Sequence, residues 1–340
     1  MHPLTKKRFK IFKSNKRAFW SAWILGFVLL FSLCAPFLAN DRPLFVLYKN
    51  TVYFPVFEQV LDSDLGGDLP TEADYADPFT QKQILKYGMV IPAPVPYRYD
   101  TIDYFSLNPF PEAPSQRHWL GTDDQGRDLI ARLIYGIRLN LSFGIVLTVL
   151  SALIGICVGA VQGYFGGKID LLIGRFLEIW GSLPQLFILI IISSLIEPSF
   201  WSLLVILLLF SWTSLTSVVR AEFLKVRAQD YVKSARALGV GDFSIMVRHI
   251  LPNALVATIT YIPFILSGAI ISLSALDFLG LGLPPGTPSL GEMVHQGKEN
   301  LQAPWIGFTA FSVLTVLLSL LIFVGEGIRD AFDPHKQEGA

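Results

Sequence analysis

Charged residues are scarce in this sequence. Only 16% of its 340 residues are Asp, Glu, Lys or Arg, whereas ordinary soluble domains carry about 25%. Hydrophobic residues make up 52%, and the mean hydropathy is +0.50. The formal net charge is zero, so there is no basic excess of the kind that attracts nucleic acid. The composition therefore indicates an integral membrane protein that does not bind nucleic acid.

Cysteine is nearly absent as well. The two cysteines, Cys34 and Cys157, each lie inside an apolar run, so a disulfide framework is not expected. We expect both to be small buried apolar residues.

Two common catalytic motifs are missing. A P-loop needs the pattern G-x-x-x-x-G-K-[ST], because backbone N–H groups hold the phosphates and the hydroxyl binds Mg²⁺. The pair Gly167-Lys168 lacks the upstream glycine and is followed by Ile169, and Gly297-Lys298 fails in the same way. No H-E-x-x-H pattern occurs, and the five histidines are scattered. We therefore expect a non-catalytic chain that hydrolyses no nucleotide, holds no catalytic zinc and binds no cofactor of its own.

The acidic stretch from Gly121 to Asp128 resembles a calcium loop only superficially. An EF-hand loop needs oxygen ligands at alternate positions and glycine at the sixth. Counting from Asp123 puts Arg127 at a ligand position and Gly126 out of phase. The stretch is predicted to be a structured turn that leads into an interfacial helix over residues 129–139.

Six apolar stretches are long enough to cross a bilayer, which takes about 20 residues; the third includes an amphipathic lead-in. They cover residues 20–39, 140–161, 171–196, 200–219, 253–279 and 305–324. The predicted fold class is an all-α integral membrane protein with six transmembrane helices. The predicted division is a basic N-terminus (1–19), a first span (20–39), an outer segment (40–137), a core of five spans (138–326) and a C-terminal tail (327–340).

Positive charge sets the expected orientation. Residues 1–17 carry seven bases and no acid, and the loop 220–252 carries six bases against three acids. Such excesses are typical of the cytoplasmic side, so both termini and this loop are predicted to be cytoplasmic. A basic start before an apolar run could also be a signal peptide. Because Phe37 and Leu38 stand where a cleavage site needs small residues, we interpret residues 20–39 as an uncleaved span.

The segment 40–137 differs in kind from the rest. It holds fourteen acids, eight bases and many prolines. Its acidity and its place after a span with a basic cytoplasmic end put it on the outer side. We expect a small domain there with irregular or short-strand structure.

The loop 220–252 has a helix–turn–helix pattern. Asp230 and Asp242 are expected N-caps, and Gly239 suits the left-handed residue that ends the first helix. The second helix is predicted to present an apolar face at i, i+3, i+4 and i+7, and Pro252 starts the next segment. The residues of that face are Phe243, Met246, Val247 and Ile250. A loop this ordered is predicted to dock another protein.

The fifth span carries several polar side chains: Thr258, Thr260, Ser267, Ser272, Ser274 and, near its outer end, Asp277. They could line a pathway, or they could hydrogen-bond between packed helices. Asp277, Glu197 and Glu326 all lie at span ends, where water is reachable. A proton relay through mid-membrane carboxylates is therefore not predicted.

The loop resembles the cytoplasmic docking motif of ABC-importer permeases, whose pattern is Glu-Ala-Ala, three residues, Gly, and then Leu-Pro. Lys233, Ser234 and Ala235 occupy the Glu-Ala-Ala positions, Gly239 is the glycine, and the pattern ends at Leu251-Pro252. Lys233 and Ser234 depart from the pattern, which puts in doubt any contact that needs the glutamate.

Six further stretches are similar to the oligopeptide and dipeptide permeases. They are Trp119–Asp128, Gly163–Lys168, Phe278–Gly282, Pro288–Gly291, Ala303–Trp305 and Gly327–Pro334. Together they cover residues 119–334. The long acidic outer segment, and Asp277 where the family more often has serine, resemble one branch that imports oligopeptides and the peptide antibiotic microcin C.

The resemblance implies a division of labour. Two permease subunits form a pathway in the bacterial inner membrane, two cytoplasmic ATPases bind ATP and Mg²⁺, and a periplasmic binding protein delivers peptide. Segment 40–137 is then periplasmic, residues 138–326 are the permease core, and loop 220–252 couples to the ATPases. The implied mechanism is alternating access.

Two other classes of function remain to be tested. A proton-coupled secondary transporter of small peptides would need a mid-membrane carboxylate and often carries inverted repeats, and neither is evident. A membrane sensor with an outer ligand-binding segment rarely needs six spans.

Overall fold

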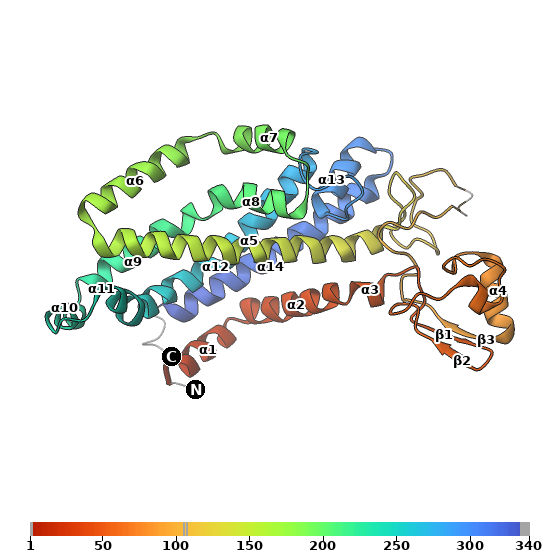
Figure 1. Ribbon diagram of the computed structural model, residues 1–340, viewed down its shortest axis with the longest axis horizontal. Coiled ribbons are helices and arrows are strands. Elements are labelled where there is room, and N and C mark those ends of the chain that lie inside the picture. Colours follow the sequence, from red (N-terminus) through yellow and green to blue (C-terminus); the bar gives the residue numbers. More distant parts are fainter. Residues whose placement is uncertain (1–2, 105, 107, 334–340) are drawn as a thin grey trace. The chain divides into compact units, whose positions relative to one another are not determined.

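The computed structural model describes residues 3–104, 106 and 108–333 (Figure 1). The chain is mostly helical, with one small sheet. Its elements are α1 (Pro3–Ser14), α2 (Lys16–Leu33), α3 (Ala35–Leu38), β1 (Phe45–Tyr48), β2 (Thr51–Tyr53), η1 (Asp62–Leu65), α4 (Pro78–Tyr87), β3 (Gly88–Ile91), α5 (Leu129–Phe165), α6 (Gly167–Ser182), α7 (Gln185–Leu195), α8 (Phe200–Ser211), α9 (Thr213–Arg227), α10 (Asp230–Ala237), α11 (Asp242–Ser244), η2 (Ile245–Ile250), α12 (Leu251–Phe278), α13 (Leu290–Glu299) and α14 (Pro304–Phe332).

These elements form two compact units. The first, which we call the helical unit, comprises the residues up to 26, residues 141–284 and those from 315 on. The second, the sheet unit, comprises residues 27–140 and 285–314. Each unit is described by itself.

The expected spans are present as long apolar helices. Four candidates are Lys16–Leu33, Leu129–Phe165, Asp242–Phe278 and Pro304–Phe332. Two bent pairs, α6 with α7 and α8 with α9, bring the number to six when each pair counts as one span.

The boundary expected near residue 139 does not exist. The predicted interfacial helix 129–139 and the predicted span 140–161 are one continuous helix of 37 residues, α5. Asn140, the polar residue at the expected junction, is fully buried and its amide donates to the carbonyl of Gly136 at 2.9 Å. Its polar group is thus satisfied within the helix, which removes the reason to end the helix there.

Both bent spans have a local cause. Between α6 and α7 the chain turns by 75° at Leu183-Pro184, where Leu183 is extended because the residue before proline avoids helical geometry. Between α8 and α9 the bend is 40°. There the hydroxyls of Thr213 and Thr216 donate to the carbonyls of Phe210 and Trp212, and such bonds often bend helices.

Small residues let α5 and α9 pack closely in the helical unit. A Cβ added at Gly155, Gly159 or Gly163 would lie 2.7–2.8 Å from a backbone carbonyl oxygen of residues 212–220. This four-residue repetition of glycine permits a close backbone approach, as in other membrane helix pairs. The core beside this contact includes Val219, Phe223 and Ile250.

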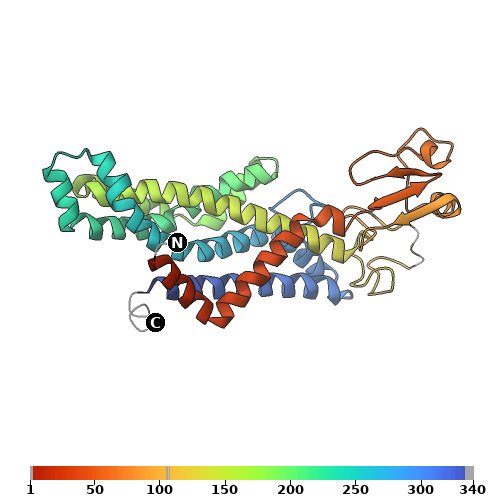
Figure 2. The same ribbon diagram turned by 90° about the horizontal axis from the view of Figure 1, so that it is seen from below.

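Helices α1 and α14 approach each other within the helical unit (Figures 1 and 2). The guanidinium of Arg8 lies 4.4 Å from the ring centroid of Phe332, and the amide of Asn15 donates to Asp330 at 3.5 Å. Residues 8–15 and the end of α14 therefore lie beside each other in this unit.

The sheet unit contains the strands, as the composition of residues 40–137 predicted. Its antiparallel sheet has the order β2-β1-β3. Val46 and Tyr48 of β1 pack with Val60, Leu65 and Ile84 into a small core. The short strands expected for this segment are therefore confirmed, and the burial of alternate residues of β1 is the pattern of a half-buried strand.

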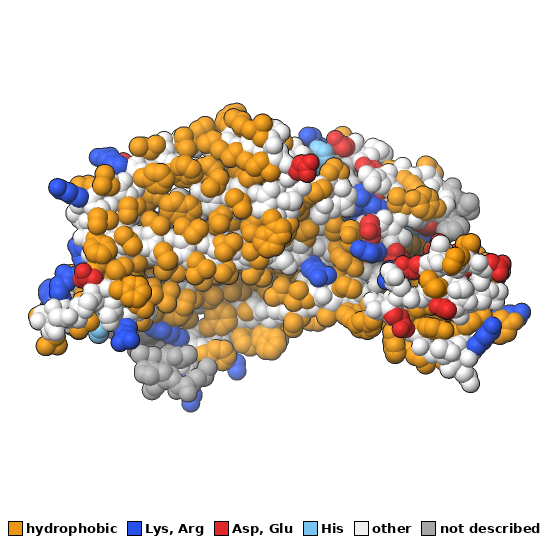
Figure 3. Space-filling model, in the orientation of Figure 1, with side chains coloured by type: hydrophobic (Ala, Val, Ile, Leu, Met, Phe, Trp, Pro, Cys, Tyr) orange, Lys and Arg blue, Asp and Glu red, His pale blue; other side chains and the backbone are white. Residues whose placement is uncertain are grey.

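Apolar side chains also cover much of the outside of the helical unit (Figure 3). On α6 and α7, Leu172 and Leu195 are 73% and 80% exposed. Both cysteines are free, as expected, but exposed rather than buried. Such a surface suits lipid or another membrane subunit and not water.

Candidate docking loop and translocation surface

We call residues 220–252 the docking loop, and the turn within it has the predicted geometry. Gly239 has φ +80°, and the N–H groups of Gly239 and Val240 donate to the carbonyls of Arg236 and Ala235 at 3.0 and 3.1 Å. This pair of bonds is a Schellman motif, which ends α10 and needs a left-handed residue. No atom lies within 4 Å of a Cβ built at Gly239, so backbone conformation rather than crowding requires the glycine.

The predicted N-caps are each one residue off. The caps are Gln229 and Gly241, and neither makes a side-chain capping bond. Asp230 and Asp242 are instead the first helical residues, where negative charge still favours the helix dipole. Asp230 pairs with Lys233 at 3.1 Å.

The four apolar residues predicted to form one face do not share one face. Ile250 is fully buried and Met246 packs against the same core, together with Ile245. Phe243 and Val247 are 78% and 41% exposed. Leu238, in the turn, is 84% exposed. We call Leu238, Phe243 and Val247 the docking patch.

One side chain of α5 holds the loop to the helical unit. Tyr164 is 2% exposed, and its hydroxyl donates to Asp242. Its carbonyl accepts a bond from Arg227 at 2.7 Å, and the guanidinium of Arg236 lies 5.2 Å from its ring centroid. The interaction with Tyr164 raises the pKa of Arg236, although an arginine is charged at physiological pH in any case.

The three residues at the Glu-Ala-Ala positions differ in their surroundings. Ala235 is buried in the core of the helical unit, whereas Lys233 and Ser234 are exposed. The side chain of Ser234 donates to the carbonyl of Asp230 within α10. Only the position that matches the family pattern, Ala235, contributes to packing.

The predicted pathway residues of span five lie on α12. Thr258, Thr260 and Ser267 are buried and donate to carbonyls of the helix itself, at 3.0, 2.6 and 2.9 Å. Ser274 is buried as well. These bonds explain how the hydroxyls are accommodated and leave the choice between pathway and helix packing open.

Ser272 faces a cavity of the helical unit. The cavity has a volume of about 460 Å³ and lies between α5, α7, α8, α9 and α12. The polar residues that line it are Gln185, Ser211, Thr213, Ser214, Tyr261 and Ser272. Of the six predicted pathway residues, Ser272 is the one that lines this cavity.

Asp277 organises the turn that follows α12. Its Oδ1 accepts the backbone N–H of Leu283 at 2.7 Å. The turn itself contains Gly280 at φ +73° and a bond of 2.9 Å from the N–H of Leu281 to the carbonyl of Leu276. The role observed for Asp277 is therefore structural.

The sheet unit contains a buried ion network that the sequence did not reveal. The carboxylate of Asp123 accepts the backbone N–H and the Nε of Arg127 at 2.9 and 2.6 Å, which is the structured turn predicted for this stretch. Arg132 is fully buried, lies 3.4 Å from Asp123 and pairs with Glu292 of α13. Burial raises the pKa of Glu292, although Arg132 opposes this shift.

His118 is at the centre of a second cluster of buried ionisable residues in this unit. Its ring nitrogens lie 2.9 Å from Asp128 and 3.3 Å from Asp103. Burial alone would lower its pKa, but the hydrogen bonds and charges of the two aspartates outweigh burial and raise the pKa. Among the residues described, no group of three His, Cys, Asp or Glu side chains could hold a metal ion.

Comparison with known proteins matches two family descriptions. Residues 129–338 match the "Binding-protein-dependent transport system inner membrane component", and residues 4–53 match the "N-terminal TM domain of oligopeptide transport permease C". Residues 54–128, between these two matched regions, are matched by neither family description.

Relatives that align over nearly the whole chain are also permeases. The inner membrane ABC transporter permease protein YejE of Escherichia coli (strain K12) is 51% identical over 336 residues, or 99% of this chain and 98% of its own. The peptidoglycan transport system permease protein YejE of Agrobacterium fabrum is 49% identical, covering 98% and 94%. The dipeptide transport system permease protein DppC of Lactococcus lactis is 30% identical, covering 96% and 89%.

The fold has a solved counterpart. A chain of the MetNI methionine ABC transporter, in an inward-facing conformation, has a TM-score of 0.51 at 18% identity, covering 60% of this chain and 97% of that chain. The full-length relatives confirm the resemblance drawn from the motifs, and the branch marked by the long acidic outer segment is the YejE type. The chain belongs to the family of inner membrane components of binding-protein-dependent transport systems.

Proposed function

We propose that this chain is the permease subunit of an ABC importer that carries short peptides across the inner membrane. The observation that carries the proposal is the full-length identity of 51% to an ABC transporter permease. The absence of a P-loop in the sequence fits a subunit that relies on partner ATPases for nucleotide hydrolysis.

The substrate class follows from the names of relatives. One relative is a dipeptide permease and another a peptidoglycan transport permease. Peptidoglycan carries short peptides, so peptides are the chemistry that these substrates share. The substrate is thus a short peptide, free or attached to a peptidoglycan fragment.

The partners are a second permease, two cytoplasmic ATPases and a periplasmic binding protein. In this arrangement both termini and the loop 220–252 are cytoplasmic, and segment 40–137 is periplasmic. The contact between Asn15 and Asp330 supports an even number of spans, since these two residues can meet only on one side of the membrane. The docking patch is the surface that the ATPase covers, because it is apolar, exposed and carried by an ordered turn.

Transport proceeds by alternating access. Closure of the ATPase pair pushes the docking patch, and the helices that hold it tilt. Nucleotide must bind one state of the complex better than the other, since a ligand without such a preference shifts nothing. The exposed apolar faces of α6 and α7 supply surface for lipid and for the second permease.

The proton-coupled alternative has no support from the relatives, which are ABC permeases. The polar residue near the end of the fifth span, Asp277, is engaged in a turn. The role of a membrane sensor is likewise not suggested by any of these names.

An uptake experiment tests the proposal. A strain lacking the chromosomal gene receives the wild-type gene or an empty vector, and uptake of labelled di- to hexapeptides and of a peptidoglycan-derived peptide is measured. Uptake should need both this chain and the partner ATPase. Uptake that is unchanged without the chain, or that persists without the ATPase and collapses with the proton gradient, contradicts the proposal.

A further inference from the structure

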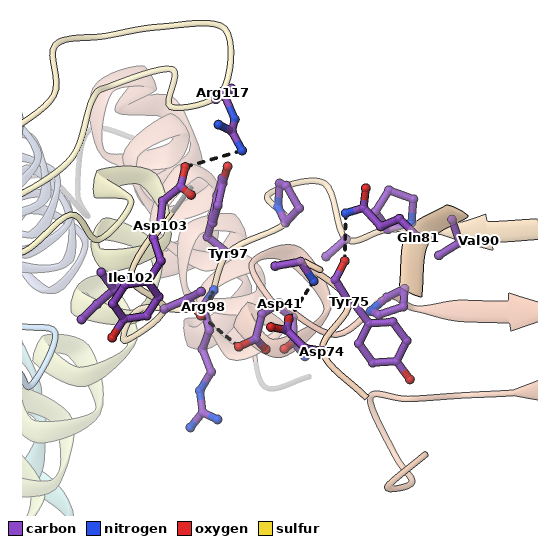
Figure 4. Close-up of a pocket in the computed structure, with 18 of the residues that line it drawn as sticks. Asp41, Asp74, Tyr75, Gln81, Val90, Tyr97, Arg98, Ile102, Asp103 and Arg117 are labelled. Atoms are coloured by element: carbon purple, nitrogen blue, oxygen red, sulfur yellow. Dashed lines mark hydrogen bonds and ion pairs between the residues drawn. The ribbon is translucent and has the colours of Figure 1, made fainter. Parts of the chain in front are cut away.

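A cavity of about 730 Å³ lies in the sheet unit, between residues 40–43, α4 with the residues before it, β3 and the loop over residues 96–104 (Figure 4). Small-molecule sites have volumes of about 300–1,000 Å³, so the cavity is large enough for a ligand of a few residues. All of its walls come from segment 40–117. It therefore belongs to the outer segment alone and not to the membrane-spanning helices.

The charge in this cavity is unbalanced. Four aspartates and two arginines line it. Arg98 pairs with Asp100 at 3.2 Å, and Arg117 lies 3.7 Å from Asp103. Both arginines are thereby engaged with aspartates of the same wall.

Two carboxylates remain, Asp41 and Asp74. Asp41 accepts the hydroxyl of Thr101 at 2.9 Å, and Asp74 accepts the backbone N–H of Ala76 at 2.8 Å (Figure 4). Within the described part of the chain, neither has a Lys, Arg or His nitrogen within 4.0 Å. Because a carboxylate offers about four acceptor positions, each has capacity left for a cationic donor.

Most of the remaining lining is apolar or aromatic, with Asn40, Gln81 and Thr101 as the polar exceptions. The aromatic lining residues include Tyr97 and Tyr104, and the apolar ones include Pro43, Ile84 and Ala93. Tyrosine faces attract ammonium groups and pack against apolar side chains. A hydrated metal ion would gain nothing from such walls, whereas an organic amine with an apolar body would.

We propose that this cavity is a peptide-binding subsite in which Asp41 and Asp74 accept the protonated amino group of a short peptide. The choice of a peptide as ligand rests on the function proposed above; the choice of an amino group rests on the cavity. A subsite in the outer segment would hold peptide on the permease itself, separately from the binding protein.

The test uses the purified full-length chain in lipid nanodiscs and two probes, trialanine and N-acetyl-trialanine. Acetylation removes the amino charge and leaves the rest of the peptide almost unchanged. Calorimetric titration should give about tenfold tighter binding of trialanine to the wild type, a ratio that corresponds to two partly solvated charge contacts. The preference should weaken at about 0.5 M salt, because salt screens exposed charges.

Three variants test whether Asp41 and Asp74 cause the preference for trialanine over N-acetyl-trialanine. The double variant Asp41→Asn/Asp74→Asn should bind both probes equally. Asp74→Asn alone should lose part of the preference, and it leaves the contact between Asp41 and Thr101 untouched, so it serves if the double variant unfolds. Asp68→Asn removes an exposed carboxylate that does not line the cavity and should behave as wild type.

Equal binding of the two probes to wild type, an undiminished preference in Asp74→Asn and the double variant, or no binding of trialanine at millimolar concentration would each overturn the subsite. Failure of the proposed function looks different. In that case deleting the whole chain leaves peptide uptake unchanged. If uptake needs the chain but the Asp variants bind like wild type, only the subsite is wrong.

Discussion

The docking patch allows a sharp test, because two apolar residues seven positions apart have opposite surroundings. Phe243 is 78% exposed, whereas Ile250 is fully buried. Truncating Phe243 to alanine removes nothing from the core of this chain. If the ATPase covers Phe243, the loss of its burial should cost about 1.5–3 kcal/mol of association free energy, which is about a 10- to 100-fold weaker complex.

The same truncation at Ile250 should act on the chain itself. A fully buried isoleucine replaced by alanine costs about 2–5 kcal/mol of the free energy of unfolding, because a cavity remains. Ile250→Ala should therefore lower the melting temperature of the purified chain in detergent. Phe243→Ala should leave it within about 1 °C, since surface substitutions rarely change stability by more than about 0.5 kcal/mol.

The assay measures binding of the purified ATPase to the permease in nanodiscs, beside thermal unfolding of each variant. Phe57→Ala is the matched control, because Phe57 is 76% exposed but lies in the sheet unit. Normal ATPase affinity of Phe243→Ala would refute the docking patch. A melting temperature lowered as much as in Ile250→Ala would refute the exposure on which the patch rests.

Four further outcomes are expected. Gly239→Val forces a branched residue into left-handed geometry at a cost of about 1–2 kcal/mol and should abolish most uptake, whereas Gly239→Asn should be tolerated; equal uptake by both contradicts the turn. Lys233→Glu should change uptake by less than about twofold, since it breaks only an exposed ion pair; abolished transport would show that charge at this position matters. Arg132→Met leaves Glu292 without its partner and should cost about 3 kcal/mol of unfolding free energy, read as a lower melting temperature. His118 has a raised pKa in the folded chain. Its contribution to stability is complete below the unfolded pKa of about 6.5 and is lost as the pH rises through the folded pKa, so the melting-temperature gap between wild type and His118→Gln should narrow as the pH rises above about 6.5.

Local chemistry explains which parts of the fold were predictable. Apolar length predicted the spans, and Gly239 forms the turn expected of it. The bend at Pro184 was not predicted, because residues 171–196 were interpreted as one continuous span. The continuity of α5 was not predictable in the same way. A polar residue such as Asn140 looks like a helix boundary in sequence, and only its bond to Gly136 shows that the helix passes through it.

The prediction that four apolar residues share one face is wrong because the second helix of the loop is not a regular α-helix. Spacings of three, four and seven residues align on a face only at 3.6 residues per turn. The segment Ile245–Ile250 is a π-helix, whose hydrogen bonds span five residues. Ile245 and Ile250, five residues apart, are therefore buried together, and Phe243 is turned out.

The ion network of the sheet unit is hidden from sequence for a different reason. Arg132 and Glu292 are separated by 160 positions, so no local spacing relates them. The acidic stretch around Asp123 indicated a turn and did so correctly. The sequence of that stretch does not indicate that Glu292 belongs to the same cluster, because only tertiary packing brings these residues together.

The contacts of Tyr164 explain why a push on the docking loop should be felt beyond the loop. This one residue of α5 bonds to Asp242, accepts from Arg227 and lies under Arg236, so both helices of the loop and the end of α9 are joined to α5. Ile250, buried in the same core, joins the loop to the start of α12. A force on the docking patch therefore acts on three spans at once. We expect Tyr164→Phe, which removes only the bond to Asp242, to keep ATPase binding and to lower the peptide transported per ATP hydrolysed. Unchanged transport per ATP would show that packing alone transmits the motion.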